Sequence, residues 1–318
     1  MEKINKNNVL GMLLLLLLAV VAGACVKDDY AASETATVTV TFTTRALSNP
    51  TVNAGGLEAN EQMRTLRVIV ARQNGEILYN LKYNIAENET SKTITFSEMT
   101  VNAEGETFDF YAIANEEGVG YNESWNDVTI AALKEMNLQD GFLTNANDAS
   151  KNTMIPQTAY QQIKVAPQTG GGIQSETMQL NFAVAKVRLT INNTSAGDQY
   201  VNDINLSGLN MTSTPLFAGE PLSEEKQGKL SLGDMTIHTG KSATVYAYFF
   251  ENTGGAYYLT ATWKENQVLD INEAAKIDNI SRGTELNINI TLHATTTPTF
   301  NIEVVPWTEV EVDVPPFN

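Results

Sequence analysis

Side chains that could carry out catalysis or bind a metal are few and far apart in this chain of 318 residues. The two histidines, His238 and His293, lie in Thr- and Gly-rich segments without a cysteine or an HExxH motif beside them. The stretch from Asp140 to Asp148 offers hard oxygen atoms but not the spacing of a calcium loop. The single glycine triplet is not followed by Lys-Ser or Lys-Thr, as a phosphate-binding loop would be. We therefore expect no enzyme, no cofactor and no metal site.

The charge balance excludes a second class of function. The chain has 37 acidic and 20 basic side chains and a formal net charge of −17, whereas contacts with nucleic-acid phosphates need clustered Lys and Arg. Only 18% of the residues are charged, below the usual quarter, which is typical of a β protein at the cell surface. The length suggests about two domains.

The sole cysteine, Cys25, is placed for attachment of lipid. Residues 1–24 have the basic start, apolar centre and small-residue end of an export signal. A cysteine directly after such residues resembles the bacterial lipobox, which implies acylation of the thiol and a durable anchor. The residues Lys27-Asp28-Asp29 resemble a surface-export signal of some Gram-negative lipoproteins. The alternatives are a transmembrane anchor, an ordinary cleavage site with a free thiol, and a solvated tether.

Arg45 is a candidate position for proteolysis, although any exposed arginine would qualify. Arg45 follows an alternating strand at residues 37–42 and precedes a loop rich in Asn, Gly and Pro that reaches about residue 62. A basic residue at such a place is readily cut by a trypsin-like protease.

Period-two alternation dominates the elements that position these residues, and Gly, Asn and Pro mark the turns between them. Many short strands with polar turns predict antiparallel sandwiches. An apolar stripe predicts one helix near 125–136, and Pro167 with Gly170-Gly171-Gly172 predicts a domain boundary at 166–177. The expected strands are 37–42, 65–72, 77–84, 92–96, 107–114, 161–166, 179–192, 243–250, 257–264, 285–292, 299–305 and 308–314.

The first strand of the mature chain is strongly two-sided. Val38, Val40 and Phe42 point to one face, and the threonines between them point to the other. We therefore expect the three apolar residues to enter a core.

The end of the chain has a complementary pattern. Two short alternating segments are separated by Pro306-Trp307, and acids alternate with the valines of the second. They form either a closing hairpin or edge strands that resist aggregation, or they are donated to another molecule as added strands. The apolar residues in question are Phe300, Ile302, Val304, Val310, Val312 and Val314.

Taken in order, these motifs resemble the fimbrillins of type V pili. The shared features are the lipobox, the strand ending in Arg-Ala, two β domains and the Pro-Trp near the end. Tyr111-Ala112-Ile113-Ala114-Asn115 and Phe182-Ala183-Val184-Ala185-Lys186-Val187 add to the likeness.

The resemblance implies an all-β protein with two transthyretin-like antiparallel β-sandwich domains and a short helix in the first. It implies a signal peptide at 1–24, a propeptide at 25–45 that carries the first strand, and domains at 46–170 and 177–318.

The resemblance also implies how the protein is anchored, cleaved and assembled. It is anchored in the outer membrane through Cys25, and an arginine-specific surface protease cuts between Arg45 and Ala46. Residues Phe300–Val314 of another copy, or of a related pilus subunit, fill the vacated groove and build an adhesive fimbrium with a host or bacterial ligand. The alternative is a surface lipoprotein that does not polymerise, such as a pilus anchor, a tip or a glycan-binding module with Tyr257, Tyr258 and Trp263 as its platform.

Overall fold

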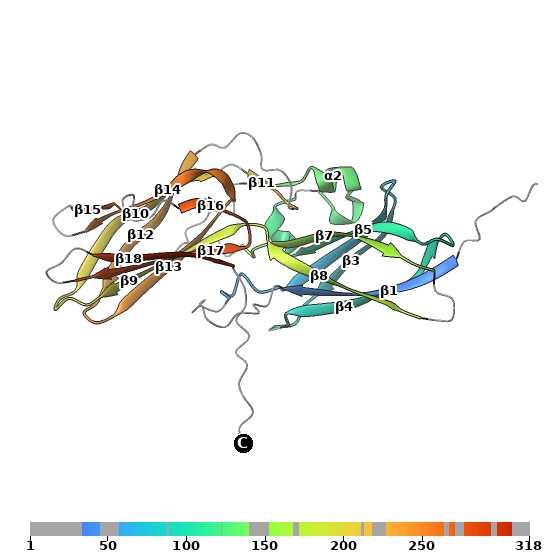
Figure 1. Ribbon diagram of the computed structural model, residues 1–318, viewed down its shortest axis with the longest axis horizontal. Coiled ribbons are helices and arrows are strands. Elements are labelled where there is room, and N and C mark those ends of the chain that lie inside the picture. Colours follow the sequence, from blue (N-terminus) through green and yellow to red (C-terminus); the bar gives the residue numbers. More distant parts are fainter. Residues whose placement is uncertain are drawn as a thin grey trace, which may run out of the picture.

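The structure is a computed structural model, and it confirms a mostly β protein built from several sheets. Residues 34–44, 57–87, 89–121, 123–139, 153–167, 172–210, 213–217, 227–263, 267–270, 277–293 and 298–306 are described below. Figure 1 shows the elements of the N-terminal and C-terminal halves at opposite ends of the long axis.

The N-terminal half is one sandwich. Its strands follow the order β3-β2-β5-β7-β8-β1-β4, and inward side chains of β1, β4 and β8 share one apolar cluster with those of β2, β5 and β7. The sheet therefore folds over on itself between β7 and β8, which pair only at two positions. The strands are β1 (Glu34–Thr44), β2 (Thr65–Arg72), β3 (Ile77–Asn84), β4 (Ser91–Val101), β5 (Glu106–Ala114), β7 (Gln157–Val165) and β8 (Gln174–Phe182).

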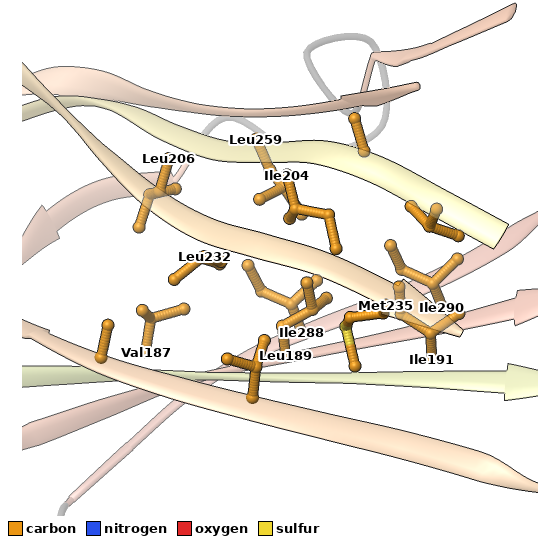
Figure 2. Packing of buried hydrophobic residues seen from close by; sticks show 14 of the residues in the cluster. Val187, Leu189, Ile191, Ile204, Leu206, Leu232, Met235, Leu259, Ile288 and Ile290 are labelled. Atoms are coloured by element: carbon orange, nitrogen blue, oxygen red, sulfur yellow. The ribbon is translucent and has the colours of Figure 1, made fainter. Parts of the chain in front are cut away.

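The C-terminal half repeats this arrangement in two sheets that enclose a second core. The sheet β13-β9-β17-β18 faces β12-β10-β14-β15, and β16 pairs with β14. Figure 2 shows how apolar side chains of β9, β10, β12, β14 and β17 interdigitate between the layers. The strands are β9 (Ala185–Asn193), β10 (Gln199–Asn210), β12 (Gln227–Ile237), β13 (Ser242–Phe249), β14 (Asn252–Trp263), β15 (Gln267–Asp270), β16 (Ile277–Ile280), β17 (Thr284–Leu292) and β18 (Thr299–Pro306).

The two halves have corresponding strand orders. In each half the first strand pairs in parallel with the last or next-to-last strand, β1 with β8 and β9 with β17. In each half the first strand also has an antiparallel neighbour on its other side, β4 or β13. The sandwiches are thus mixed rather than wholly antiparallel, because these two pairs join strands from opposite ends of each half.

The chain passes between the sandwiches later than expected. Met178 and Leu180 of β8 are buried in the N-terminal core, so this strand belongs to the first half although the second domain was expected to begin at residue 177. The predicted strand 179–192 is two strands, β8 and β9, separated at Ala183-Val184. The predicted break at Gly170–Gly172 therefore precedes a strand of the first half, and Gly170 and Gly171 themselves lie outside the described residues.

A third apolar cluster joins the two sandwiches. It covers the outer face of β2 and β5, which are buried on both sides, and includes Leu216, Tyr248 and Phe250 from the C-terminal half. A small sheet in which β6 (Asn137–Gln139) pairs with β11 (Ser213–Pro215) spans the same joint. The helical segments over this face are η1 (Glu116–Val119), η2 (Trp125–Asp127) and α2 (Ile130–Lys134).

The expected helix is confirmed, but it is short. Thr129 caps the start of α2 by accepting a hydrogen bond from the Ala132 N–H at 3.2 Å. Ile130 and Leu133 are the buried residues of this single turn, and both pack in the apolar cluster between the two sandwiches.

Charged side chains lie inside the joint as well. Lys186 on β9 is fully buried, and its Nζ lies 2.6 Å from Glu61 Oε1 and 3.5 Å from Glu285 Oε2. Arg188 lies 2.8 Å from Glu285 and 3.3 Å from Glu58. We call Glu58, Glu61, Lys186, Arg188 and Glu285 the joint cluster. It holds residues 58–61 of the N-terminal half against two strands of the C-terminal half.

Candidate functional site

The candidate site is β1 together with the groove that it fills. Alternate residues of β1 are buried, and Val38, Val40 and Phe42 each have 0% of their surface exposed. The prediction that these three residues enter a core is confirmed. Full burial of side chains of this size contributes about 1.5–3 kcal/mol each to folding.

β1 is a central strand with a neighbour on both sides. It pairs antiparallel with β4, where Val40 is opposite Ile94, and in parallel with β8, where Phe42 is opposite Met178. A register shift lies between Ala36 and Val38 on the β4 side. Removing β1 would therefore expose the backbone edges of two strands as well as an apolar trough.

The trough is lined by apolar side chains of β4, β8 and β5. Ile94, Phe96 and Met99 of β4 and Met178 and Leu180 of β8 form its sides, and each is at most 5% exposed. The Phe96 and Phe110 rings meet edge to face, with centroids 5.6 Å apart, and close its floor.

The outer face of β1 is held by hydroxyl pairs. The Thr39 and Thr95 Oγ1 atoms are 3.1 Å apart, and those of Thr41 and Thr93 are 3.0 Å apart. Such cross-strand pairs add about 0.2–1 kcal/mol each. They fix the register of β1 against β4 without contributing to the core.

β1 ends at Thr44, immediately before the predicted cleavage position. The Thr44 N–H and hydroxyl both donate to the Thr90 carbonyl, at 2.8 and 3.2 Å. Arg45 and Ala46, and also Cys25 and the export signal at 1–24, lie outside the described residues.

The chain that follows this region is anchored firmly. Asn115, which has a left-handed backbone with φ of 57°, accepts a hydrogen bond from the Arg64 N–H at 2.9 Å. Its Nδ2 donates to the Gln62 and Ile155 carbonyls at 3.0 and 2.9 Å, and Gln157 donates to the Glu61 carbonyl at 2.9 Å. These hydrogen bonds hold residues 61–64 on the sandwich, and none of them involves β1.

The first part of the expected donor segment forms β18 in its own molecule. β18 pairs antiparallel with β17, and Ile302 packs against the C-terminal core. It is the last strand in the order of its sheet, and among the described residues β17 is the strand with which it pairs. Phe300 and Val304 have defined backbone positions opposite Ile290 and Leu286. Val310, Val312 and Val314 lie outside the described residues.

The aromatic platform considered for glycans does not form on β14. Trp263 is 5% exposed and belongs to the C-terminal core, where its Nε1 donates to Gln199 at 2.9 Å. Tyr258 is 41% exposed on the opposite face of the same strand. Alternation along β14 separates the two rings, and the side chain of Tyr257 is not among those described.

The histidines have local polar partners. His238 is exposed, and its Nδ1 lies 2.9 Å from Asp198 Oδ2, a hydrogen bond that lowers the pKa of the Asp198 carboxyl. His293 lies 3.1 Å from Thr194 and 3.3 Å from Thr299. Within the described ranges, no three His, Cys, Asp or Glu side chains gather closely enough to hold a metal ion. The acidic stretch from Asp140 to Asp148 lies outside those ranges.

The described part of the chain contains no helix long and apolar enough to cross a membrane.

Comparisons of structure place this fold among fimbrial proteins. A fimbrilin from Porphyromonas gingivalis W83 matches with a TM-score of 0.54 and 11% identity, over 86% of this chain and 98% of that one. A fimbrial assembly protein from Parabacteroides distasonis matches with a TM-score of 0.51 and 12% identity, over 86% and 99%. The C-terminally truncated tip fimbrial protein Mfa3 of P. gingivalis matches with a TM-score of 0.51 and 13% identity, over 85% and 100%.

The chain thus has the two-part β fold of Bacteroidales fimbrial proteins. No family model matches the sequence. A search of curated proteins likewise found no match.

Proposed function

We propose that this protein is a structural, non-enzymatic subunit of a cell-surface fimbrium that polymerises by strand exchange. The observation that carries the proposal is the position of β1, whose Val38, Val40 and Phe42 are fully buried between β4 and β8. Its fold, shared with fimbrial proteins, supports the same role. In this proposal each half is a transthyretin-like sandwich.

The proposed sequence of events begins at the membrane. The precursor is exported by the signal at 1–24, lipidated at Cys25 and displayed on the outer membrane. An arginine-specific surface protease cuts between Arg45 and Ala46, so residues 25–45 leave with β1 and the lipid. Thr44 is the last residue of β1, and therefore a cut at this position separates the whole strand from the rest of the protein.

A neighbouring subunit then fills the groove. Its segment Phe300–Val314 has the same alternation as β1, so its apolar row can restore both the buried surface and the two hydrogen-bonded edges. Among the described residues, β18 pairs with β17 alone, so its release breaks one ladder of hydrogen bonds, whereas insertion between β4 and β8 forms two. The contact between neighbouring subunits is heterologous, and such contacts build an open filament.

One observation favours the alternative of a surface lipoprotein that does not polymerise. Ile302 of β18 packs against the core of its own molecule, and in this position β18 is not available to a neighbouring subunit. In the polymerisation proposal either β18 leaves this position, or Val310, Val312 and Val314 alone enter the neighbouring groove.

Cleavage can be tested with the Arg45→Ala precursor. We expect an arginine-specific protease to generate an N-terminus at Ala46 and detergent-resistant oligomers in the wild type, whereas Arg45→Ala remains a lipid-anchored monomer. Arg64→Ala is the matched control, because Arg64 is a partly exposed arginine outside the proposed cleavage site, and this variant should polymerise normally. Normal fibres from Arg45→Ala would show that cleavage there is not the trigger.

Two deletions separate the donor segments. Deleting 307–318 removes the valine row but leaves β18, and deleting 299–318 removes both. Loss of polymer in both variants assigns the essential donor to 310–314, and loss in the second alone assigns it to β18. Undiminished polymer from both would exclude the tail as the donor, whereas absence of polymer from the wild-type protein would favour the non-polymerising alternative.

A further inference from the structure

A cavity of about 370 Å³ lies where the two sandwiches meet, and its β8 residues Met178 and Gln179 are also opposite Phe42 and Thr43 of β1. β7 and β8 form one wall, and Phe217 after β11 and Arg282 before β17 complete it. Its volume falls in the range of small-molecule sites in proteins.

The cavity exists because β7 and β8 separate. They pair at Gln157–Phe182 and Thr158–Asn181 and then diverge. At the far end the Gln174 amide reconnects them by donating to the Lys164 carbonyl at 3.0 Å. The opening between these two closures is therefore held at both ends by the fold.

An exposed and rigidly held aromatic ring stands at this opening. Tyr160 is 46% exposed, yet its hydroxyl donates to Asp109 at 2.9 Å and its ring centroid lies 4.9 Å from that of Tyr111. The Phe217 ring packs edge to face on Tyr111 with centroids 5.2 Å apart. A ring fixed in this way offers a flat apolar surface at little entropic cost.

The remaining wall carries side-chain amides that the fold does not use. Gln161, Gln179 and Asn181 line the cavity, and no hydrogen bond within the described residues engages their amides. Each amide provides two donors and an oxygen acceptor. Such groups complement a ligand whose neighbouring hydroxyls both donate and accept.

The cavity offers no uncommitted charge to an ionic ligand. The Arg282 guanidinium donates to Glu251 at 2.7 Å through Nε, to the Leu216 carbonyl at 3.3 Å through Nη1 and to Thr214 at 3.0 Å through Nη2. All three nitrogens are therefore occupied. The net charge of −17 further disfavours anionic ligands.

We propose that this cavity binds a neutral saccharide. The apolar face of a sugar ring packs on Tyr160, and its hydroxyls bond the amides of Gln179 and Asn181, which share the outer face with Tyr160. The assignment does not require strand exchange, because it concerns the uncleaved subunit, in which β1 is in place beside β8.

The test uses the full-length, uncleaved protein on an array of neutral and acidic glycans, followed by calorimetric titration of the best neutral ligand. We expect binding to neutral glycans, lowered at least about tenfold by Tyr160→Ala, which corresponds to about 1.4 kcal/mol. Gln179→Ala, at an exposed position, should also weaken binding, whereas Tyr160→Phe should retain most of it because the stacking ring remains.

Tyr258→Ala is the matched control, since Tyr258 is an exposed tyrosine of similar exposure on β14, and it should bind as the wild type does. The proposal is overturned if no neutral glycan binds the wild-type protein, if acidic glycans alone bind, or if Tyr160→Ala and Tyr258→Ala have the same effect. Circular dichroism of each variant separates loss of binding from loss of fold.

Discussion

Phe42 is the largest side chain of the β1 row, and it lies beside Met178 of β8 in a fully buried position. Val38 and Val40 occupy smaller sites along the same trough. At the scale of single residues, the affinity of the groove for a strand therefore depends most on what fills the Phe42 site.

We expect Phe42→Ala in the uncleaved precursor to lower the free energy of unfolding by about 3–5 kcal/mol, because it leaves a cavity in a closed core. Thr41→Ala is the control, since it loses only a hydroxyl pair with Thr93 on the outer face and should cost at most about 1 kcal/mol. Chemical denaturation measures both. Equal effects would contradict the assignment of Phe42 to the trough.

Tyr248 makes the joint sensitive to alkali. Burial, with the nearby Glu61 carboxylate, raises the pKa of the Tyr248 phenol well above its usual range. The folded state therefore keeps its proton when the unfolded state, with a pKa of about 10, has lost it. Stability from this group is complete below pH 10 and falls as the pH rises above that value.

Tyr248→Phe should consequently be less stable than the wild type at pH 8, where it loses a hydrogen bond, but should lose less stability between pH 9.5 and 11. Thermal unfolding across this range compares the two proteins. Parallel pH profiles would show that the Tyr248 phenol does not contribute to the alkaline loss.

At the scale of elements, β1 is a central strand that pairs with β4 on one side and β8 on the other. Its place between β4 and β8 means that a chain starting at Ala46 lacks the middle of a sheet. The anchors of residues 61–64 on Asn115 and Gln157 remain in such a chain, so the groove should persist as a binding site for a strand.

A peptide of residues 34–44 added to the chain lacking residues 1–45 should therefore bind and raise the melting temperature. At a concentration a hundredfold above its Kd the stabilisation is about 2.7 kcal/mol. The same peptide with Val40→Asp should not bind, because it would bury an unpaired carboxylate. Stabilisation by both peptides alike would indicate nonspecific association instead of insertion.

At the scale of the whole molecule, the joint cluster links residues 58–61 to the C-terminal sandwich. Glu58 and Glu61 come from the segment after the proposed cleavage loop, and Lys186, Arg188 and Glu285 come from β9 and β17. The two halves are thereby held together without any contribution from β1.

Lys186→Met should destabilise the protein by about 3–5 kcal/mol, since Glu61 remains buried without its cation. We expect calorimetry to show two transitions in place of one as the halves unfold separately. The control Arg64→Met breaks an exposed pair with Glu87 and should cost about 0–1 kcal/mol. A single transition with wild-type stability in Lys186→Met would mean that the apolar cluster alone holds the joint.

The sequence by itself determined which residues of β1 are buried, because alternation along a strand assigns side chains to faces locally. The same rule gave most strand positions, and an apolar stripe gave the position of the short helix.

Only the tertiary structure decided which strands are neighbours. The pairing of β1 with β8 joins segments far apart in the chain, and no local pattern encodes it, so β8 was assigned to the wrong half. The joint cluster and the Tyr160 cavity arise in the same way. Packing removes water and brings segments that are far apart in the sequence within contact distance. Only then do Glu61, Lys186 and Glu285 form ion pairs, and only then do Tyr160 and Phe217 lie at one cavity.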